Sequence, residues 1–213
     1  ELLPASDFSV EQLTEAYNQT RVDYLVPMPM SVARLRDYIN TYDIALDSSV
    51  VAVDGSQMLG LCMLGLRPGR AWVTRLGVLP ASRRRGSAFE MMTWCLDRAR
   101  EIGVDYTCLE VIEGNEPALN LFLRLGFSEM RRLLILRRPP SPVTVPALAA
   151  IEGLDTVAAL ELIQQRHWQP AWTNQNESLA RAGPQFGFAG GRHGLPRLSR
   201  LRRAKQWHAD AAD

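Results

Sequence analysis

The apolar positions of the first forty residues recur at helical spacing in two segments. Residues 9–21 place their apolar side chains on one face of a helix, and Ser9 can cap its start. A second helix is predicted from Ser31 to about Tyr42, again with a serine cap. Residues 22–30 contain two prolines and cannot continue either helix. The pattern therefore predicts two amphipathic helices joined by a proline-broken loop.

The period then changes to that of strands. Apolar runs at residues 50–54, 58–67 and 70–79 are separated by Asp54-Gly55 and Pro68-Gly69, which are strong turn signals. Three consecutive strands with tight turns are typical of an antiparallel meander.

Helices and strands alternate in the next segment. We predict a helix over Gly86–Ile102, a strand over Tyr106–Ile112, a helix over Pro117–Leu125 and a strand over Met130–Leu136. Because the long helix connects neighbouring strands, this half of the sheet should be parallel. The predicted fold class is α/β, with a mixed, mostly antiparallel central sheet that contains a parallel pair and is flanked by helices.

A proline-rich run marks the clearest domain boundary. The sequence Arg137-Arg138-Pro139-Pro140-Ser141-Pro142 is typical of a stiff linker. We predict a first domain at 1–137, a linker at 138–146 and a short, helical C-terminal extension at 147–213.

The amino-acid composition favours a globular protein without a membrane span or a metal site. The chain has 213 residues, a hydrophobic fraction of 46% and a net charge of +1, which suit an ordinary globular core. No apolar run approaches the ~20 residues that span a bilayer. The three cysteines lie in apolar contexts, and no histidine has a partner at metal-ligand spacing. We expect a cytoplasmic protein with neither a membrane partner nor a metal.

The stretch from Leu76 to Ala88 carries the clearest chemistry. A strand ends at Pro80, an arginine-rich turn follows, and a helix begins at Gly86. Backbone N–H groups at a helix start have no partner inside the helix, and the helix dipole adds positive charge. Such a start is a ready site for a diphosphate, and glycine lets the ligand approach closely. Further positive charge at the rim comes from Arg83, Arg84 and Arg85.

This stretch resembles the coenzyme A pyrophosphate loop of the GNAT N-acetyltransferases, in the pattern Val78-x-Pro80-x-x-Arg83-x-x-Gly86-x-Ala88. A second resemblance, to the later strand and helix of that family, lies in Leu109-Glu110-Val111 followed by Asn115-x-x-Ala118-x-x-Leu121-Phe122-x-x-Leu125-Gly126-Phe127. The resemblance to the family as a whole covers about residues 5–137, and residues 26–29 also resemble one bacterial subgroup of it. The resemblance implies acetyl-CoA as co-substrate.

The resemblance also assigns residues to the coenzyme. In the family, the strand before the loop splays from the strand after the helix, and the pantetheine arm enters the gap. Backbone groups of Leu76 and Val78 would bind the thioester and pantetheine, and Asn115 would contact the coenzyme arm. The pyrophosphate would be held by the Arg83 side chain and by the amides of Arg84, Arg85, Gly86, Ser87 and Ala88.

Catalytic groups are less evident. Many family members place a tyrosine, as general acid, at the position of Phe122, which has no proton to give. Glu110 is the candidate base, directly or through water; a structural carboxylate and a proton carried by water alone are the alternatives. The proline-broken loop is the candidate acceptor site, with Asp23 and Tyr24 as its polar members.

Two function classes follow from these residues. One is an active N-acetyltransferase whose acceptor is a small-molecule or peptide amine, with a homodimer as an open alternative to a monomer. The other is a catalytically degenerate module or sensor that binds acetyl-CoA, a reading that Phe122 motivates. A nucleic-acid-binding protein is a distant third, based on the basic residues at 192–205, and we do not expect nucleic acid as a partner.

The tail after residue 184 allows three interpretations. It could bind nucleic acid or an acidic partner, serve as a dimerisation arm, or be an out-of-frame end of the coding sequence. Trp172-x-Asn174 and Glu177-Ser178-Leu179 resemble the entry to a second acetyltransferase-like domain. We therefore favour a truncated second domain.

Overall fold

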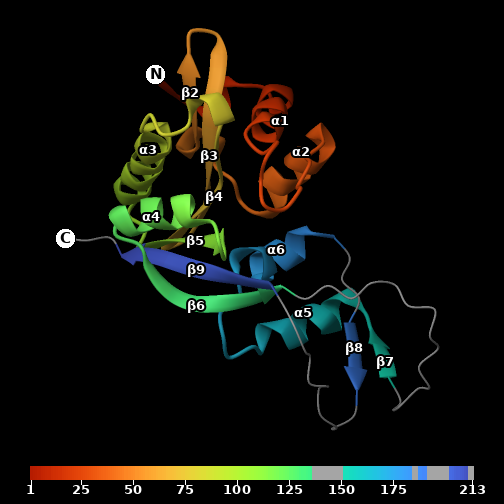
Figure 1. Cartoon of the computed structure of the whole chain (residues 1–213). Coiled ribbons are helices and arrows are strands. Elements are labelled where there is room, and N and C mark those ends of the chain that lie inside the picture. The colour runs from red at the N-terminus through yellow and green to blue at the C-terminus, as the bar shows by residue number, and fades with distance from the viewer. Residues whose placement is uncertain (136–150, 184–186, 191–201, 211–213) are drawn as a thin grey trace. The chain divides into compact units, whose positions relative to one another are not determined.

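The structure is a computed structural model that describes residues 1–135, 151–183, 187–190 and 202–210 (Figure 1). The chain divides into two compact units. The first comprises Glu1–Arg132 together with Ala204–Asp213, and the second comprises Leu133–Arg203. The predicted linker at 138–146 lies outside the described residues, as do residue 136 of the last predicted strand and most of the basic run at 192–205.

Seven strands form the sheet of the first unit, in the order β1-β2-β3-β4-β5-β9-β6. Strands β1 to β4 pair antiparallel with their neighbours, β4 and β5 run parallel, and β9 runs antiparallel to β5. The predicted mixed, mostly antiparallel sheet is thus confirmed. The strand bounds are Leu2–Pro4 (β1), Val50–Asp54 (β2), Gln57–Arg67 (β3), Arg70–Val78 (β4), Tyr106–Ile112 (β5), Ser128–Ile135 (β6) and Arg202–Asp210 (β9).

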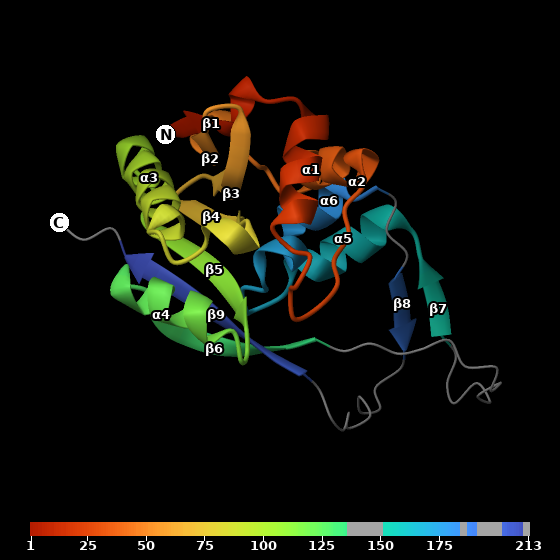
Figure 2. The same cartoon turned by 45° about the horizontal axis from the view of Figure 1, so that its top comes forward.

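Helices flank both faces of this sheet (Figures 1 and 2). Helices α1 (Val10–Gln19) and α2 (Val32–Thr41) lie on one face, and α3 (Ser87–Ile102) packs on the other. Helix α4 (Glu116–Arg124) joins β5 to β6. The expected serine caps are present, since the side chains of Ser9 and Ser31 accept hydrogen bonds from the backbone three residues on. Short 3₁₀ turns lie at Ala5–Asp7, Leu46–Ser48 and Pro80–Ser82.

Strands β4 and β5 pair only at one end. Arg70–Trp72 lie beside Tyr106–Cys108, but β4 continues to Val78 and β5 to Ile112 without pairing to each other. The two strands therefore leave an open edge between them, on the side of the sheet where α3 begins.

A bulge interrupts β4 shortly before that open edge. Met63 of β3 pairs with Thr74, whereas Leu61 pairs with Gly77, so β4 has one residue more than β3 at this point. The extra length places Arg75 at a φ of 55°, a left-handed conformation that is uncommon for any residue except glycine. The bulge thus changes the face of the sheet toward which the side chains after Thr74 point.

The second unit contains α5 (Thr156–Gln164), a 3₁₀ turn (Trp172–Asn174) and α6 (Asn176–Arg181). It also contains a two-stranded antiparallel sheet of β7 (Ile151–Leu154) and β8 (Gly187–Gly190), which the sequence did not predict. Its contact-defined boundary follows Arg132, five residues before the predicted domain end, and the last residues of the chain group with the first unit instead. The truncated second domain stays a prediction.

Candidate active site

The loop between β4 and α3 presents a row of backbone amides. Gly86 caps α3 at a φ of 93°, and the preceding Arg84 has a φ of 64°. The first helical bonds are donated by the amides of Phe89 and Glu90, which both reach the Gly86 carbonyl. Within the described residues, no hydrogen bond uses the amides of residues 84–88. In this part of the described chain, five donors therefore lie without a partner at the start of α3, where the helix dipole also favours an anion.

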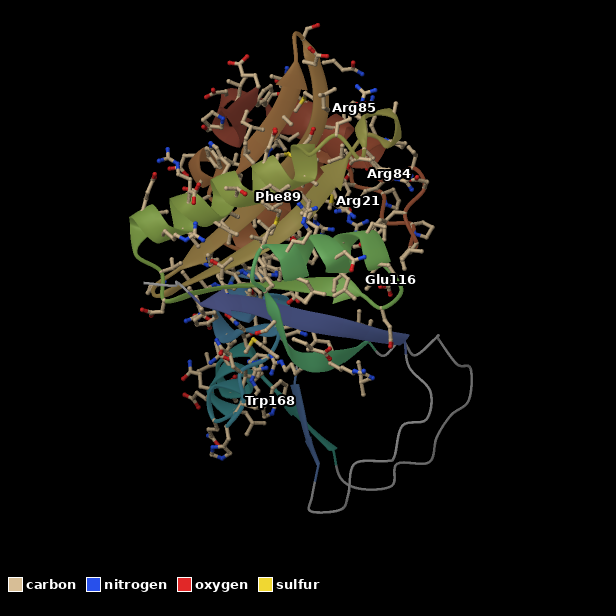
Figure 3. All side chains as sticks on the ribbon, turned by 60° about the vertical axis from the view of Figure 1, so that its left-hand side comes forward. Arg21, Arg84, Arg85, Phe89, Glu116 and Trp168 are labelled. Atoms are coloured by element: carbon tan, nitrogen blue, oxygen red, sulfur yellow. The ribbon has the colours of Figure 1, made fainter. Side chains whose placement is uncertain are left out.

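The arginines of this loop differ in their surroundings. Arg84 and Arg85 are exposed and project from the ribbon before α3 (Figure 3). Arg83 instead donates two hydrogen bonds to Asp23, at 2.6 and 2.7 Å, and further bonds to the carbonyls of Val78 and Thr20. The bond from Arg83 lowers the pKa of the Asp23 carboxyl below its usual value. Two residues that the sequence analysis assigned to different ligands thus form one bidentate ion pair.

The backbone of β4 faces the open edge at Leu76 and Val78. Leu79 donates its N–H to Leu59 of β3 at 2.8 Å, and alternate residues of a strand face opposite edges. The edge carbonyls are occupied by arginine side chains, since Arg21 donates to Leu76 at 3.0 Å and Arg83 donates to Val78 at 3.1 Å. A ligand at this edge would replace those two bonds.

Glu110 lies on β5 across from β4 and is half-buried. Its Oε2 accepts a hydrogen bond of 2.9 Å from the indole nitrogen of Trp72. The Trp72 ring packs near the rings of Tyr38 and Tyr42, with centroids 6.2 and 6.1 Å away. The candidate base is therefore held in one orientation by an aromatic cluster under α2.

The two candidates on α4 have structural partners. Phe122 is 6% exposed, belongs to the main core cluster and packs against Phe127 with ring centroids 6.0 Å apart. Asn115 caps α4, with its Oδ1 accepting from the Ala118 amide at 3.4 Å. The buried phenyl ring agrees with the inference that this position supplies no proton.

A cluster of arginine and tyrosine side chains joins α1 and α2 to β4, and sequence reasoning did not find it. Arg75 donates to the Tyr17 hydroxyl at 3.0 Å and stacks over the Tyr38 ring at 4.1 Å. Arg21 stacks over Tyr17 and over Tyr24, the predicted acceptor residue, at 4.9 and 4.5 Å. Burial raises the pKa of the Tyr38 hydroxyl, which stays protonated and is hydrogen-bonded to Thr74 at 2.7 Å.

Gly77 is a further residue that sequence reasoning missed. A Cβ at this position would lie 2.4 Å from the Thr20 hydroxyl oxygen, so no larger residue fits where the end of α1 meets β4. The close approach brings Arg21 and Asp23, which follow α1, to the open edge. A glycine inside a strand was the available signal.

A mixed sheet that opens between two parallel strands, beside a helix start with free amides, places this protein in the class of acyltransferases. More specifically, the chain belongs to the acetyltransferase (GNAT) family, whose profile matches residues 11–127, more than half of the chain. The predicted family is thus confirmed.

Solved structures share the fold at low identity. YncA of Salmonella typhimurium, a putative acetyltransferase with bound acetyl-CoA, aligns with a TM-score of 0.57 at 12% identity, over 100% of this chain and 94% of that one. The ribosomal-protein-S18-alanine N-acetyltransferase of Escherichia coli aligns with a TM-score of 0.56 at 12% identity, over 100% of this chain and 94% of that one. A chain of the NatC complex bound to Gag peptide and CoA aligns with a TM-score of 0.53 at 20% identity, over 63% of this chain and 87% of that one. A comparison with curated protein sequences finds no match.

Two further observations concern partners. Among the described residues, no group of three or more histidine, cysteine, aspartate or glutamate side chains is arranged to hold a metal ion. No helix within that same part of the chain is long and apolar enough to cross a membrane.

Proposed function

We propose that this protein transfers the acetyl group of acetyl-CoA to an amine. The observation that most directly supports this proposal is the row of five amides at the start of α3, none of which has a hydrogen-bond partner within the described residues. A pyrophosphate accepts hydrogen bonds from such a row, and Arg84 and Arg85 add positive charge at its exposed rim.

The open edge of β4 suits the rest of the coenzyme. From the start of α3, the pantetheine arm would run along the backbone of Val78 and Leu76, with the thioester near Leu76. Arg21 and Arg83 now donate to those carbonyls, and both would exchange these bonds for others when the arm binds. Asn115 retains its side-chain N–H donors at the start of α4, which supports a contact with the coenzyme arm.

The proposed reaction is direct acyl transfer. The nitrogen of a neutral amine attacks the thioester carbonyl carbon, a C–N bond forms, and the C–S bond breaks to release the thiolate. Glu110, oriented by Trp72, takes the amine proton directly or through water. Because Phe122 is buried and has no acidic proton, we assign protonation of the thiolate to water.

The acceptor class stays open at this level. The NatC structure contains a peptide, and the E. coli enzyme is named for an alanine of a ribosomal protein. These neighbours favour a peptide amine as the acceptor. A small-molecule amine is the alternative acceptor. A homodimer, a cytoplasmic location and a bacterial source are parts of the same proposal.

The second candidate function is an acetyl-CoA-binding module without turnover. The burial of Phe122, at the position where many family members carry an acid, favours it. Such a module would bind acetyl-CoA and release no free thiol with any amine, whereas an enzyme would release one thiol for each amine acetylated.

The coenzyme site can be tested by titrating acetyl-CoA into the protein in a calorimeter. Gly86→Asp places a negative charge where the pyrophosphate is proposed to bind, and its affinity should fall at least about tenfold, a loss of about 1.4 kcal/mol. Gly103→Asp is the matched control, because Gly103 has a φ of 78° at the far end of the same helix and an added Cβ would meet no close contact at either glycine.

The two variants share backbone strain and added charge, so a difference in acetyl-CoA affinity between them reports on where the charge lies and not on its presence. Loss of binding in Gly86→Asp, with binding kept in Gly103→Asp, supports the coenzyme site. Equal affinities in the wild type and Gly86→Asp, or no binding by the wild type, would refute the site. A screen for thiol release with amines then separates enzyme from module.

A further inference from the structure

The arginine–tyrosine cluster lies on the α1 and α2 face of the sheet, next to the open edge. Its members come from three elements and one turn: Tyr17 from α1, Arg21 from the turn just after that helix, Tyr38 from α2, and Arg75 from β4. Arg75 contacts both tyrosines, and Arg21 reaches from Tyr17 to the Leu76 carbonyl. The cluster therefore meets the backbone position at which we propose the thioester to lie.

The bulge in β4 aims Arg75 into this cluster. With the extra residue, Thr74 and Arg75 both turn to the α2 side, where Thr74 bonds to the Tyr38 hydroxyl and Arg75 stacks on the Tyr38 ring. Leu76, the next residue, packs against the opposite core. A left-handed backbone at an arginine costs free energy, and backbone strain of this kind clusters at functional sites.

Neither guanidinium has an anionic partner. The structure records no ion pair for Arg21 or Arg75 within the described residues. In each, the Nε atom is buried and makes no hydrogen bond. A buried guanidinium donor without an acceptor is costly, and carboxylates and phosphates match its fork of donors. By contrast, Arg83 and Arg67 of the same unit each have an aspartate partner.

We propose that Arg21 and Arg75 recognise an anionic group on the acceptor, so that the substrate is an amine that also bears a carboxylate or a phosphate. This inference rests on the proposed function. The amine would lie toward the thioester and Glu110, while the anionic group would fill the unmet donors of the two arginines. Polyamines, whose second group is cationic, would be repelled from the same position.

Matched acceptors test this proposal through thiol release from acetyl-CoA. The carboxylate arm compares glycine with glycinamide and β-alanine with its amide. The phosphate arm compares phosphoethanolamine with ethanolamine. We expect at least one anionic acceptor to exceed its neutral partner in kcat/KM by about tenfold. The amides have the less basic amine, and so more neutral nucleophile, which biases the carboxylate comparison against this result.

Two variants remove the proposed recognition. For each acceptor pair, the ratio of kcat/KM for the anionic acceptor to kcat/KM for the neutral one should fall towards one in Arg75→Gln and in Arg21→Gln. The main cause should be a higher KM for the anionic acceptor. Arg36→Gln is the control, because Arg36 lies on the exposed side of α2 and pairs with Glu11. If Arg75→Gln fails to fold, Arg21→Gln carries the same test. A purely structural role would slow both acceptors equally and leave the ratio unchanged.

The outcomes separate this inference from the proposed function. A neutral acceptor that equals or exceeds its anionic partner in both arms overturns the anionic acceptor and leaves the acetyltransferase standing. A ratio that persists in both arginine variants overturns the assignment of these two residues. Absence of thiol release with every amine, although acetyl-CoA binds, overturns the proposed enzyme and this inference with it.

Discussion

At the scale of single residues, the three cysteines lead to a prediction that also serves the assays. Cys62 and Cys95 are 0% exposed and Cys108 is 3% exposed, and burial raises the pKa of the Cys95 thiol well above its usual value. Since the thiolate is the reactive form, a thiol reagent at pH 8 should leave the native protein unlabelled and modify three thiols per chain in urea.

Counting the labelled thiols by mass spectrometry checks this prediction. Rapid native labelling would contradict the burial of all three side chains. An unlabelled native protein means that a thiol-release assay reads coenzyme A alone, which the acceptor comparisons require.

The features of the candidate site that depend on local pattern could be predicted from the sequence. Gly86 and the amides after it follow from a strand, a turn and a helix start in sequence order, and the absence of an acidic proton at Phe122 is a property of the residue itself. The ion pair of Arg83 with Asp23 and the stacking of Arg75 on Tyr38 join residues far apart in the chain. No local pattern encodes such a contact, so these pairs required the fold.

At the scale of elements, the Arg83–Asp23 pair ties the loop between α1 and α2 to the loop before α3. Both side chains are substantially exposed, so solvent screens the pair and its contribution to stability is small. The tie matters more for position, because it holds the candidate acceptor loop against the candidate coenzyme loop.

The pair predicts a specific pH dependence. Arg83 lowers the pKa of Asp23 in the folded protein below the ordinary aspartate value of 3.8, so the pair contributes stability above about pH 3.8 and loses it as the pH falls through the lowered pKa. Asp23→Asn should therefore unfold at a slightly lower temperature than the wild type at pH 7, and the difference should shrink below pH 4.

Thermal unfolding at pH 7, 5, 4 and 3 measures this difference. Asp37→Asn, on the exposed side of α2 and without a recorded ion pair, is the control and should track the wild type throughout. A difference for Asp23→Asn that stays constant down to pH 3 would show that the carboxylate charge is not what stabilises the loop.

Most elements of the first unit could be predicted from periodicity and turns. The meander follows from Asp54-Gly55 and Pro68-Gly69, and the parallel pair follows from the helix between β4 and β5. Strand β1 was missed because three residues that end in a proline carry too little period. Strand β9 was missed because its partner β5 lies about a hundred residues earlier, and pairing at that separation leaves no local signal.

At the scale of the whole molecule, the C-terminal strand changes how the chain is divided. The sequence predicts one extension at 147–213, whereas β9 lies between β5 and β6 in the sheet of the first unit. In the sequence, β7, α5, α6 and β8 come after β6 and before β9, two strands of that sheet. Among the described residues, Arg202–Asp210 is therefore a structural part of the sheet of the first unit.

Removing the chain after residue 201 tests this arrangement. The seven register pairs between β9 and β5, from Tyr106 with Asp210 to Ile112 with Ala204, would be lost. At a net ~1 kcal/mol for each backbone hydrogen bond and about one bond for each register pair, the loss is about 7 kcal/mol, which lowers Tm by roughly 14–28 °C in a chain of this size. The exposed edge of β5 should also promote association, visible by light scattering.

Deletion of residues 211–213 alone is the control, because these residues follow the strand, and it should leave Tm unchanged. If the chain that ends at residue 201 had the same Tm as the full-length protein, the placement of β9 in the sheet would be contradicted. That result would instead favour the interpretation of the tail as an out-of-frame end or a truncated second domain, because neither requires β5 to have a partner from the last residues of the chain.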